Sequence, residues 1–427
     1  MNVGFNKGLV TQISNKANEP EWMLDLRLKA LDKYFQLPVP RLTKTKIDKW
    51  NIDKFILATE QPEQNLDDLP IEIQTLIINN KDSNLLVQKN STVIFQKVSE
   101  VLANRGVILT DLNSALKDYP ELIKKYFMDS TAYDENKLVA LHTALWSGGL
   151  FLYVPGNTEV EIPVQAIFIG TETGMFPHIL IIAEDNSSLT YVDHYYSIEP
   201  EKSSLHNGVV EIYVGENANV RFASIHNFNR TSYDYTHRKA IVKRNGRIEW
   251  IIGEMNSGNT VSTNESRLEE TAATADSKSI FIGTGNQQTN FEAKVVHIGD
   301  YTESNILSHG VMADDSIGIF NGITKIEKGA VKSNAAQAEK VLMLSHGARG
   351  DVNPILLIDE HDVIAGHAAS AGPVDSNDIY YLMSRGITRE EAERLIIHGF
   401  LTPVVSRIPI EGLQEELKNV IERKLKK

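Results

Sequence analysis

The sequence predicts a mainly β protein with a parallel β-helix at its centre, an α-rich region before it and a helical region after it. Three observations predict this architecture. At Gly148 and Gly149 the helical spacing of apolar residues gives way to short runs of Val, Ile, Phe, Tyr and Thr separated by Gly, Asn and Asp. A short unit recurs within this β block, and helical spacing returns after Asp375. We therefore expect three regions, at residues 1–147, 148–374 and 375–427.

The first region is predicted to be mostly helical. Pro20 suits the first turn of a helix. After it, apolar residues recur at helical spacing, at Trp22, Met23, Leu26, Ala30 and Leu31. A β-pair is expected in "LLVQKNSTVIF", and further helices in "TDLNSALKDYPELIKKYF" and "ENKLVALHTALW".

The β block contains a recurring unit in which a turn asparagine and a small residue precede an apolar, a polar and an aromatic residue. It occurs as "NSSLTY" at Asn186, "NANVRF" at Asn217 and "NGRIEW" at Asn245, which lie 31 and 28 residues apart. One unit is too short to bury its own apolar face, so stacked turns sharing one core are favoured. Because the period is imperfect, an antiparallel sandwich or barrel remains an alternative.

The third region is predicted to begin with two short helices. "SNDIYYLMSRG" has polar residues that start a helix and Gly386 to end it. In "TREEAERLIIHGF", Thr388 and Glu391 have the spacing of a capping box. The apolar face expected for this helix is Ala392, Leu395, Ile396 and Phe400. Such a face packs on the end of the β-helix or binds a partner.

Composition excludes several classes of partner. The chain of 427 residues has a net charge of −13, so its field repels nucleic acid and anionic lipid. No stretch approaches the roughly 18 consecutive apolar residues of a membrane span, and the N-terminal stretch lacks the apolar core of a signal peptide. With no cysteine there is no disulfide. We expect a cytoplasmic protein that binds neither nucleic acid nor membrane.

Sequence motifs of common enzymes are missing. "KGAVKS" lacks the glycine spacing of a P-loop, and there is no nucleophile elbow or zinc-protease motif. Two alternative functions remain to be weighed. A β-helix enzyme acting on polysaccharides needs clustered acids on one face and usually a secretion signal, and neither is visible. A small-molecule-binding β protein does not need terminal helices that face solvent.

Four histidines fall late in the β block, at His309, His346, His361 and His367. Stacked turns bring residues that are tens of positions apart close together. With Asp359, Glu360 and Asp362 they form a candidate set of nitrogen and oxygen ligands for a divalent metal such as iron. Without thiolates, the chain alone cannot hold an iron–sulfur cluster in an all-cysteine site.

Long segments resemble the SufB/SufD family of iron–sulfur cluster assembly proteins. They are "EPEWMLDLRLKAL", "YPELIKKYF", "LVALHTALWSGGLFLYVP", "NESRLEETAATADSKSIFIGTG" and "DEHDVIAGHAASAGPVDSNDIYYLMSRGITREEAERLIIHGFLTPVV". They cover nearly the whole chain, in the expected order. Within the family, the SufB branch is longer and carries cysteines thought to hold the nascent cluster. A cysteine-free chain of this length resembles the SufD branch.

The resemblance implies a right-handed parallel β-helix between helical ends, and a scaffold subunit rather than an enzyme. It implies pairing with SufB through the late β-helix strands, for which we single out Leu356, Ile358 and Val363 within residues 342–369. An isolated chain is expected to form a homodimer through the same segment. It also implies binding of the ATPase SufC, which carries out ATP hydrolysis, through the C-terminal helices. The residues expected to contact SufC are Tyr380, Tyr381, Leu382, Arg385, Ile396 and Phe400.

The resemblance assigns one metal-binding residue. The family pattern D-V-x-(C or A)-x-H-(G or A)-A places its histidine on His367, with Ala365 where some relatives have cysteine. His367 is therefore expected to be a transient ligand of iron or of a nascent cluster, shared with SufB. No cofactor is expected to stay bound to this chain alone. His361 matches no functional position and is expected to be a surface residue, and Pro373 stands where relatives often have a basic residue.

Overall fold

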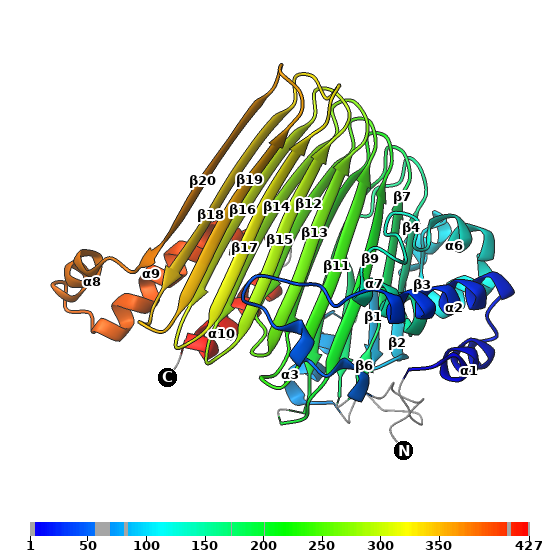
Figure 1. Ribbon diagram of the computed structural model, residues 1–427, viewed down its shortest axis with the longest axis horizontal. Coiled ribbons are helices and arrows are strands. Elements are labelled where there is room, and N and C mark those ends of the chain that lie inside the picture. The colour runs from blue at the N-terminus through cyan, green and yellow to red at the C-terminus, as the bar shows by residue number, and fades with distance from the viewer. Residues whose placement is uncertain are drawn as a thin grey trace.

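In the computed structural model, two β-sheets lie face to face and are built from alternate strands of the chain (Figure 1). The structure describes residues 5–55, 69–80, 84–171, 173–199, 201–407 and 411–425. Within each sheet, the central strands pair in parallel with the strands two places before and after them. The chain winds as a solenoid of about eight turns, which confirms the predicted parallel β-helix and excludes the antiparallel sandwich or barrel.

The solenoid strands divide between the two sheets. The first sheet contains β5 (Val164–Gly170), β8 (Ser188–Ser197), β10 (Asn219–Asn227), β12 (Arg247–Glu254), β14 (Thr274–Gly283), β16 (Glu303–Met312), β18 (Asn334–Met343) and β20 (Ile364–Pro373). The second contains β4 (Gly149–Val154), β7 (His178–Ala183), β9 (Leu205–Val214), β11 (Tyr233–Val242), β13 (Asn259–Leu268), β15 (Gln288–His297), β17 (Ile317–Ile326) and β19 (Arg349–Ile358), with the short β6 (Gly174–Met175) beside β9.

The elements before the solenoid are mostly helical, as predicted. They are α1 (Lys7–Ala17), α2 (Glu21–Gln36), the 3₁₀ turns η1 (Ile47–Lys49) and η2 (Ile52–Lys54), α3 (Ile71–Asn80), β1 (Asn84–Lys89), β2 (Thr92–Lys97), α4 (Glu100–Asn104), β3 (Ile108–Asp111), α5 (Leu112–Asp118), α6 (Pro120–Tyr126) and α7 (Lys137–Leu145). The predicted β-pair is the antiparallel hairpin β1–β2. Helices α1, α2 and α7 share one apolar cluster with the outer faces of β4, β7 and β9, so they cover the start of the second sheet.

The two ends of the solenoid differ in their sheet edges. At the N-terminal end the edges are β2, six residues long, and β3, four residues long, and both pair in antiparallel fashion. The register between β1 and β2 shifts at Val87 and Gln88. At the C-terminal end the edges are β19 and β20, each ten residues long. The long unpaired edges therefore lie together in the last coil.

The recurring asparagines occupy equivalent turns of successive coils. Asn186, Asn217 and Asn245 each adopt a left-handed backbone, with φ of 57°, 55° and 54°. The Asn217 amide donates to Asn186 Oδ1 at 3.0 Å, and the Asn245 amide donates to Asn217 Oδ1 at 3.0 Å. Asn157 extends this ladder by one coil and was not identified from the sequence. Asparagine recurs because it tolerates this backbone and bonds the adjacent coil.

Substitutions at Asn217 separate two contributions to stability, that of the left-handed backbone and that of the side-chain hydrogen bonds between coils. Asn217→Gly keeps an easy left-handed backbone but removes two exposed hydrogen bonds, and should cost about 1 kcal/mol. Asn217→Ala also places an ordinary side chain in the left-handed region and should cost about 1–2 kcal/mol more. Urea unfolding of both variants beside the wild type tests this order of stability. Equal stability of Asn217→Gly and wild type would show that the ladder contributes nothing.

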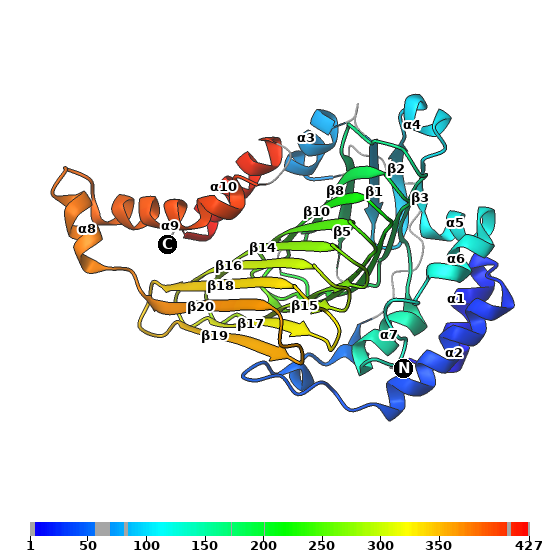
Figure 2. The ribbon, with the colours of Figure 1, turned by 90° about the horizontal axis from the view of Figure 1, so that it is seen from above.

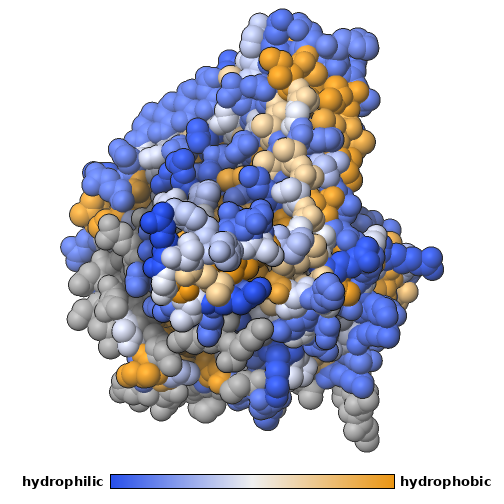
Figure 3. Space-filling view, turned by 90° about the vertical axis from the view of Figure 1, so that its left-hand side faces the viewer, coloured by the Kyte–Doolittle hydropathy of each residue, from blue (hydrophilic) through white to orange (hydrophobic). Residues whose placement is uncertain are grey.

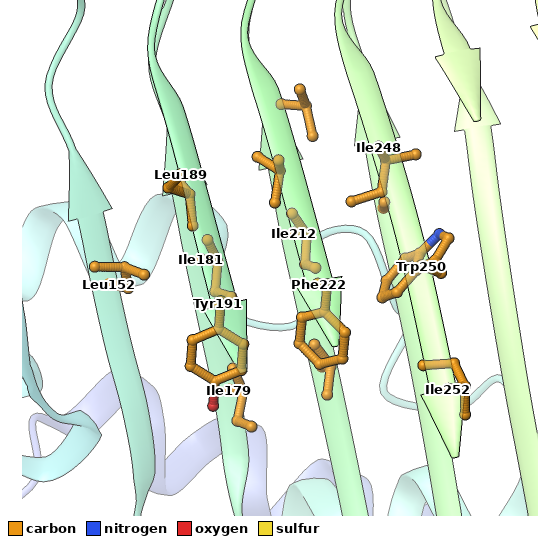
Figure 4. Close-up of a cluster of buried hydrophobic side chains, with 14 of the residues drawn as sticks. Leu152, Ile179, Ile181, Leu189, Tyr191, Ile212, Phe222, Ile248, Trp250 and Ile252 are labelled. Carbon is orange, nitrogen blue, oxygen red and sulfur yellow. The ribbon is translucent and has the colours of Figure 1, made fainter. Parts of the chain in front are cut away.

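The two sheets enclose an apolar interior over much of the solenoid (Figure 4). Leu152 and Ile181 come from the second sheet, and Tyr191, Phe222 and Trp250 come from the first. They occupy alternate positions of their strands, because successive side chains of a strand point to opposite faces. Full burial of such a side chain is worth roughly 1.5–3 kcal/mol, so this interior is the main stabilising core.

The C-terminal region contains α8 (Ser376–Met383), α9 (Arg389–Val405) and α10 (Glu411–Leu425). The predicted capping box of Thr388 and Glu391 is present at the start of α9. Gly386, with φ of 88°, ends the turn after α8. In Figure 2, α9 and α10 run beside the first sheet, while α8 projects away from the solenoid. Among the described helices, none is long and apolar enough to span a membrane.

One of the two alternatives predicted for the C-terminal helices, packing on the end of the β-helix, is wrong. Helices α9 and α10 pack on the outer face of β8, β10, β12, β14 and β16, in one apolar cluster. The buried residues of α9 are Ala392, Ile397, Leu401, Val404 and Val405, whereas Leu395 is 51% exposed. The predicted apolar face is therefore rotated relative to the observed one, because the helix follows the side of the sheet and leaves the last coil uncovered.

Candidate functional site

The last coil offers an unpaired strand whose donors can be assigned. The N–H of Ile364 donates to Ser333 O at 2.9 Å. Because the N–H groups of a strand point alternately to its two edges, this bond sets their directions along β20. The N–H groups that face the free edge belong to Ala365, His367, Ala369 and Ala371. The strand then ends at Pro373, which has no N–H and stops further pairing.

The other edge strand, β19, is less suited to pairing. The N–H of Arg349 donates to Ser316 O, so the alternate positions of β19, including Pro354, point to the free edge. Pro354 interrupts the donors at the middle of this edge. The geometry therefore favours β20 as the strand on which a further chain can pair.

His367 lies near the middle of β20, in register with Gln337 of β18. Gln337 is buried in the solenoid, where its amide donates to Thr324 Oγ1 at 2.6 Å. His367 therefore lies on the same inner face of the sheet, but no further coil covers it and it is exposed. Neither of its ring nitrogens has a hydrogen-bond or ionic partner in the described part of the chain. An added Cβ at neighbouring Gly366, which points to the opposite face, would meet no atom within 4 Å, so β20 is open on both faces here.

A buried carboxyl group lies one strand away from His367. Glu339 follows Gln337 by two residues on β18, so its side chain also points inward. Its carboxyl oxygens have no hydrogen-bond partner among the described residues, and burial raises its pKa to about 7. It packs against Gly322, where an added Cβ would lie 1.8 Å from Glu339 Oε1. Glu339 was not predicted from the sequence, although its alternation with Val341 marks it as an inward position.

The residues predicted to pair with SufB lie in the last coil. Leu356 and Ile358 are in β19, with N–H groups that face the free edge, and Val363 is in the turn before β20. Ile358 is exposed, whereas Leu356 and Val363 are half-buried, and the neighbouring Ile364 is 71% exposed. Figure 3 faces this end of the molecule and shows a band of apolar and small side chains running down it. In the last coil, the further exposed apolar residues that were not predicted from the sequence are Ile355, Leu357 and Ile364.

The other three late histidines do not join His367. His361 is exposed in the turn between β19 and β20, and His346 is exposed in the turn at the opposite end of β19. His309 is buried on the outer face of β16, where its Nδ1 lies 2.6 Å from the carbonyl oxygen of Phe400. Within the described residues, no group of three metal-ligating side chains forms around His367. The metal site proposed from four histidines within one chain is therefore wrong.

The residues predicted to contact SufC separate into two groups. Tyr380 and Tyr381 of α8 are 73% and 58% exposed, and Arg385 donates to Tyr381 Oη at 3.1 Å. Leu382 and Ile396 are half-buried. Phe400 stacks on His309 with ring centroids 4.5 Å apart, so it packs against the solenoid. The exposed tyrosines, rather than Phe400, form an available surface.

Comparison with known proteins agrees with this architecture. The model of the SufBD protein N-terminal region matches residues 11–166, and the model of the SUF system FeS cluster assembly SufBD core domain matches residues 167–400. The chain belongs to the SufBD family. This confirms the resemblance seen in the sequence. It favours an assembly protein over a polysaccharide-active enzyme or a small-molecule-binding protein.

Relatives within the SufBD family are similar over nearly their full length. The iron-sulfur cluster assembly protein SufD of Bacillus subtilis is 48% identical over 97% of this chain and 96% of its own length. Iron-sulfur cluster assembly SufBD family proteins of Staphylococcus aureus strains USA300 and NCTC 8325 are 33% identical, over 96% of this chain and 90% of their own length. The higher identity to a SufD agrees with the similarity to the SufD branch.

Proposed function

We propose that this SufBD family protein is the SufD-type, non-catalytic subunit of a cytoplasmic scaffold that assembles iron–sulfur clusters. It pairs with a SufB homologue through the last coil and binds the ATPase SufC through its C-terminal helices. ATP hydrolysis belongs to SufC. Iron and the nascent cluster are cargo of this scaffold, and the last coil of this chain alone keeps neither of them bound.

The observation that carries the proposal is the free edge of β20. It presents backbone donors from Ala365 to Ala371, with the partner-free imidazole of His367 among them. A strand of the partner that pairs here adds main-chain hydrogen bonds on both sides of His367. The imidazole then faces the interface, where a ligand from SufB and His367 together bind iron. Glu339, one strand away, is a carboxyl group of this chain that is able to exchange a proton near neutral pH.

The second part of the proposal rests on α8. Its exposed tyrosines lie on a short helix that follows β20 and extends away from the two sheets in Figure 2. Binding of SufC to α8 therefore leaves the free edge of β20 available to SufB. Co-purification of the untagged SufB and SufC homologues with this chain, with the stoichiometry measured, tests whether both partners bind together.

Two proline substitutions test the pairing edge. Ala369→Pro removes an N–H that faces the free edge and leaves the ladder to β18 intact, so it should abolish capture of SufB while the melting temperature stays close to wild type. The matched control Ala368→Pro removes an N–H that bonds β18 and should destabilise the last coil by roughly 1–3 kcal/mol. Capture of SufB by Ala369→Pro at the wild-type level would contradict pairing through this edge.

A further inference from the structure

A polar cluster interrupts the apolar interior of the solenoid. Two residues further along the strands of Figure 4, inward positions change from Tyr191 and Phe222 to Asp193 and Ser224. His206 of β9, His226 of β10 and Asp234 of β11 meet there, all buried. This cluster lies in the middle coils, away from the last coil.

The two imidazoles share one carboxylate. Nδ1 of His206 lies 2.8 Å from Asp234 Oδ1, and Nδ1 of His226 lies 2.7 Å from Asp234 Oδ2. The carboxylate is held in place by Thr236, whose hydroxyl donates to Oδ1 at 2.9 Å, and by Asn256, whose amide donates to Oδ2 at 2.7 Å. Two imidazole nitrogens and a carboxylate oriented by outer hydrogen bonds are a common ligand set for divalent transition metals.

The charge of the cluster is unbalanced. Glu254 is buried, and its carboxylate oxygens lie 3.6 Å from Arg238 Nη2 and 4.0 Å from His226 Nδ1, with no hydrogen-bond donor in the described chain. Asp193 is equally buried, and neither of its oxygens accepts a well-formed hydrogen bond from a described residue. Three carboxylates therefore face one guanidinium, that of Arg238. Buried charge without compensation is costly.

Protonation of the imidazoles does not restore the balance. Arg238 Nη2 lies 2.8 Å from Nε2 of His226, and a guanidinium only donates, so Nε2 accepts and this ring is neutral. Nε2 of His206 is buried and bonds to no described residue, whereas its Nδ1 faces Asp234, so this ring is neutral as well. With both rings neutral, the cluster carries two negative charges in excess, which one divalent cation would neutralise.

We propose that the interior of the solenoid binds one divalent transition-metal ion, such as Fe(II) or Zn(II), through His206, His226 and Asp234, with Glu254 beside it. Coordination through Nδ1 moves the proton of each ring to its Nε2, which in His226 lies 3.1 Å from Ser224 Oγ. Arg238 is then released to pair with Glu254. This site is separate from His367 and does not depend on the proposed function.

The side chain of Phe228 contacts both the cluster and a surface cavity. Phe228 packs on the rings of His206 and His226, with centroids 5.3 Å and 5.9 Å away, and its other side lines a surface cavity of about 670 Å³. Arg423 and Lys424 also line this cavity, so we expect metal to enter slowly. Metal titrations should therefore be left to reach equilibrium over hours.

The test uses the full chain, freed of metal with a chelator and titrated with Co(II), followed by competition with Zn(II). One equivalent of Co(II) should bind, and X-ray absorption should show two imidazole ligands. Asp234→Asn and His206→Gln should each weaken binding at least about tenfold. His297→Gln alters another buried histidine, which is bonded to Thr302 and Ser304, and should bind as the wild type does.

Three results would overturn the proposal. They are absence of stoichiometric uptake by the wild-type chain, absence of imidazole in the X-ray absorption spectrum, and unchanged affinity in a folded Asp234→Asn variant. The X-ray absorption spectrum of the wild type tests for imidazole ligands even if the variants fail to fold. His367→Ala distinguishes the two sites: loss of Co(II) binding in that variant would assign the metal to the last coil instead.

Discussion

Replacement of His367 by alanine is expected to reduce cluster formation to background while leaving the complex with SufB and SufC assembled. The side chain is exposed and has no partner among the described residues, so its removal should not alter the fold. The backbone N–H of residue 367 remains, so strand pairing persists. In cells that lack the native gene, the activity of a dependent iron–sulfur enzyme measures the effect.

Two further substitutions define the role of this imidazole. A ligand role does not tolerate His367→Gln, whereas a hydrogen bond across the interface does. His361→Ala, in the exposed turn between β19 and β20, is the control and should have little effect. Normal enzyme maturation by His367→Ala, or dissociation of its complex, would make the histidine structural.

Simultaneous replacement of Tyr380 and Tyr381 by alanine is expected to abolish capture of SufC. Large aromatic residues at the centre of an interface typically contribute about 2 kcal/mol or more each. Loss of both therefore weakens binding by about a thousandfold. Because both side chains are exposed in the free chain, the melting temperature should not change. A pull-down of SufC measures the capture, and a thermal melt of the same variant measures its stability.

Controls for this variant come from the same molecule. Tyr301→Ala alters another exposed tyrosine, in a solenoid turn, and should capture SufC normally. Phe400→Ala should instead lower the stability, because this ring stacks on His309. Full capture by the double variant would remove α8 from the interface. Deletion of the whole region after Asp375 is a poorer test, because it exposes the apolar cluster that α9 and α10 cover.

Sequence periodicity predicted the architecture where turn chemistry repeats. Asn186, Asn217 and Asn245 were recognisable because a left-handed turn favours asparagine. In later coils, Ala272, Tyr301 and Lys332 adopt the same backbone conformation, held by hydrogen bonds to adjacent coils, and carry no turn signal. The period therefore looked imperfect although the coils continue regularly.

The polar residues inside the solenoid could not be predicted in the same way. Alternation of residues along a strand distinguishes its two faces. It does not show whether a face with polar residues points to solvent or is covered by the opposite sheet. His206, His226 and Asp234 come from three strands of two sheets, and each looks like an ordinary exposed residue in its own segment. The four late histidines show the converse error. Their positions in successive coils suggested one shared site, but His309 lies on the outer face of β16, under α9.

The unequal sheet edges of the solenoid limit the size of its assemblies. The N-terminal edges, β2 and β3, are short and antiparallel, and the register beside β2 is irregular, so they are poor templates for another strand. A pairing that joins two last coils uses the long edges of both molecules and leaves none to extend the stack. Association through this end therefore closes at two chains, whereas a solenoid with long edges at both ends would add molecules head to tail into a fibre.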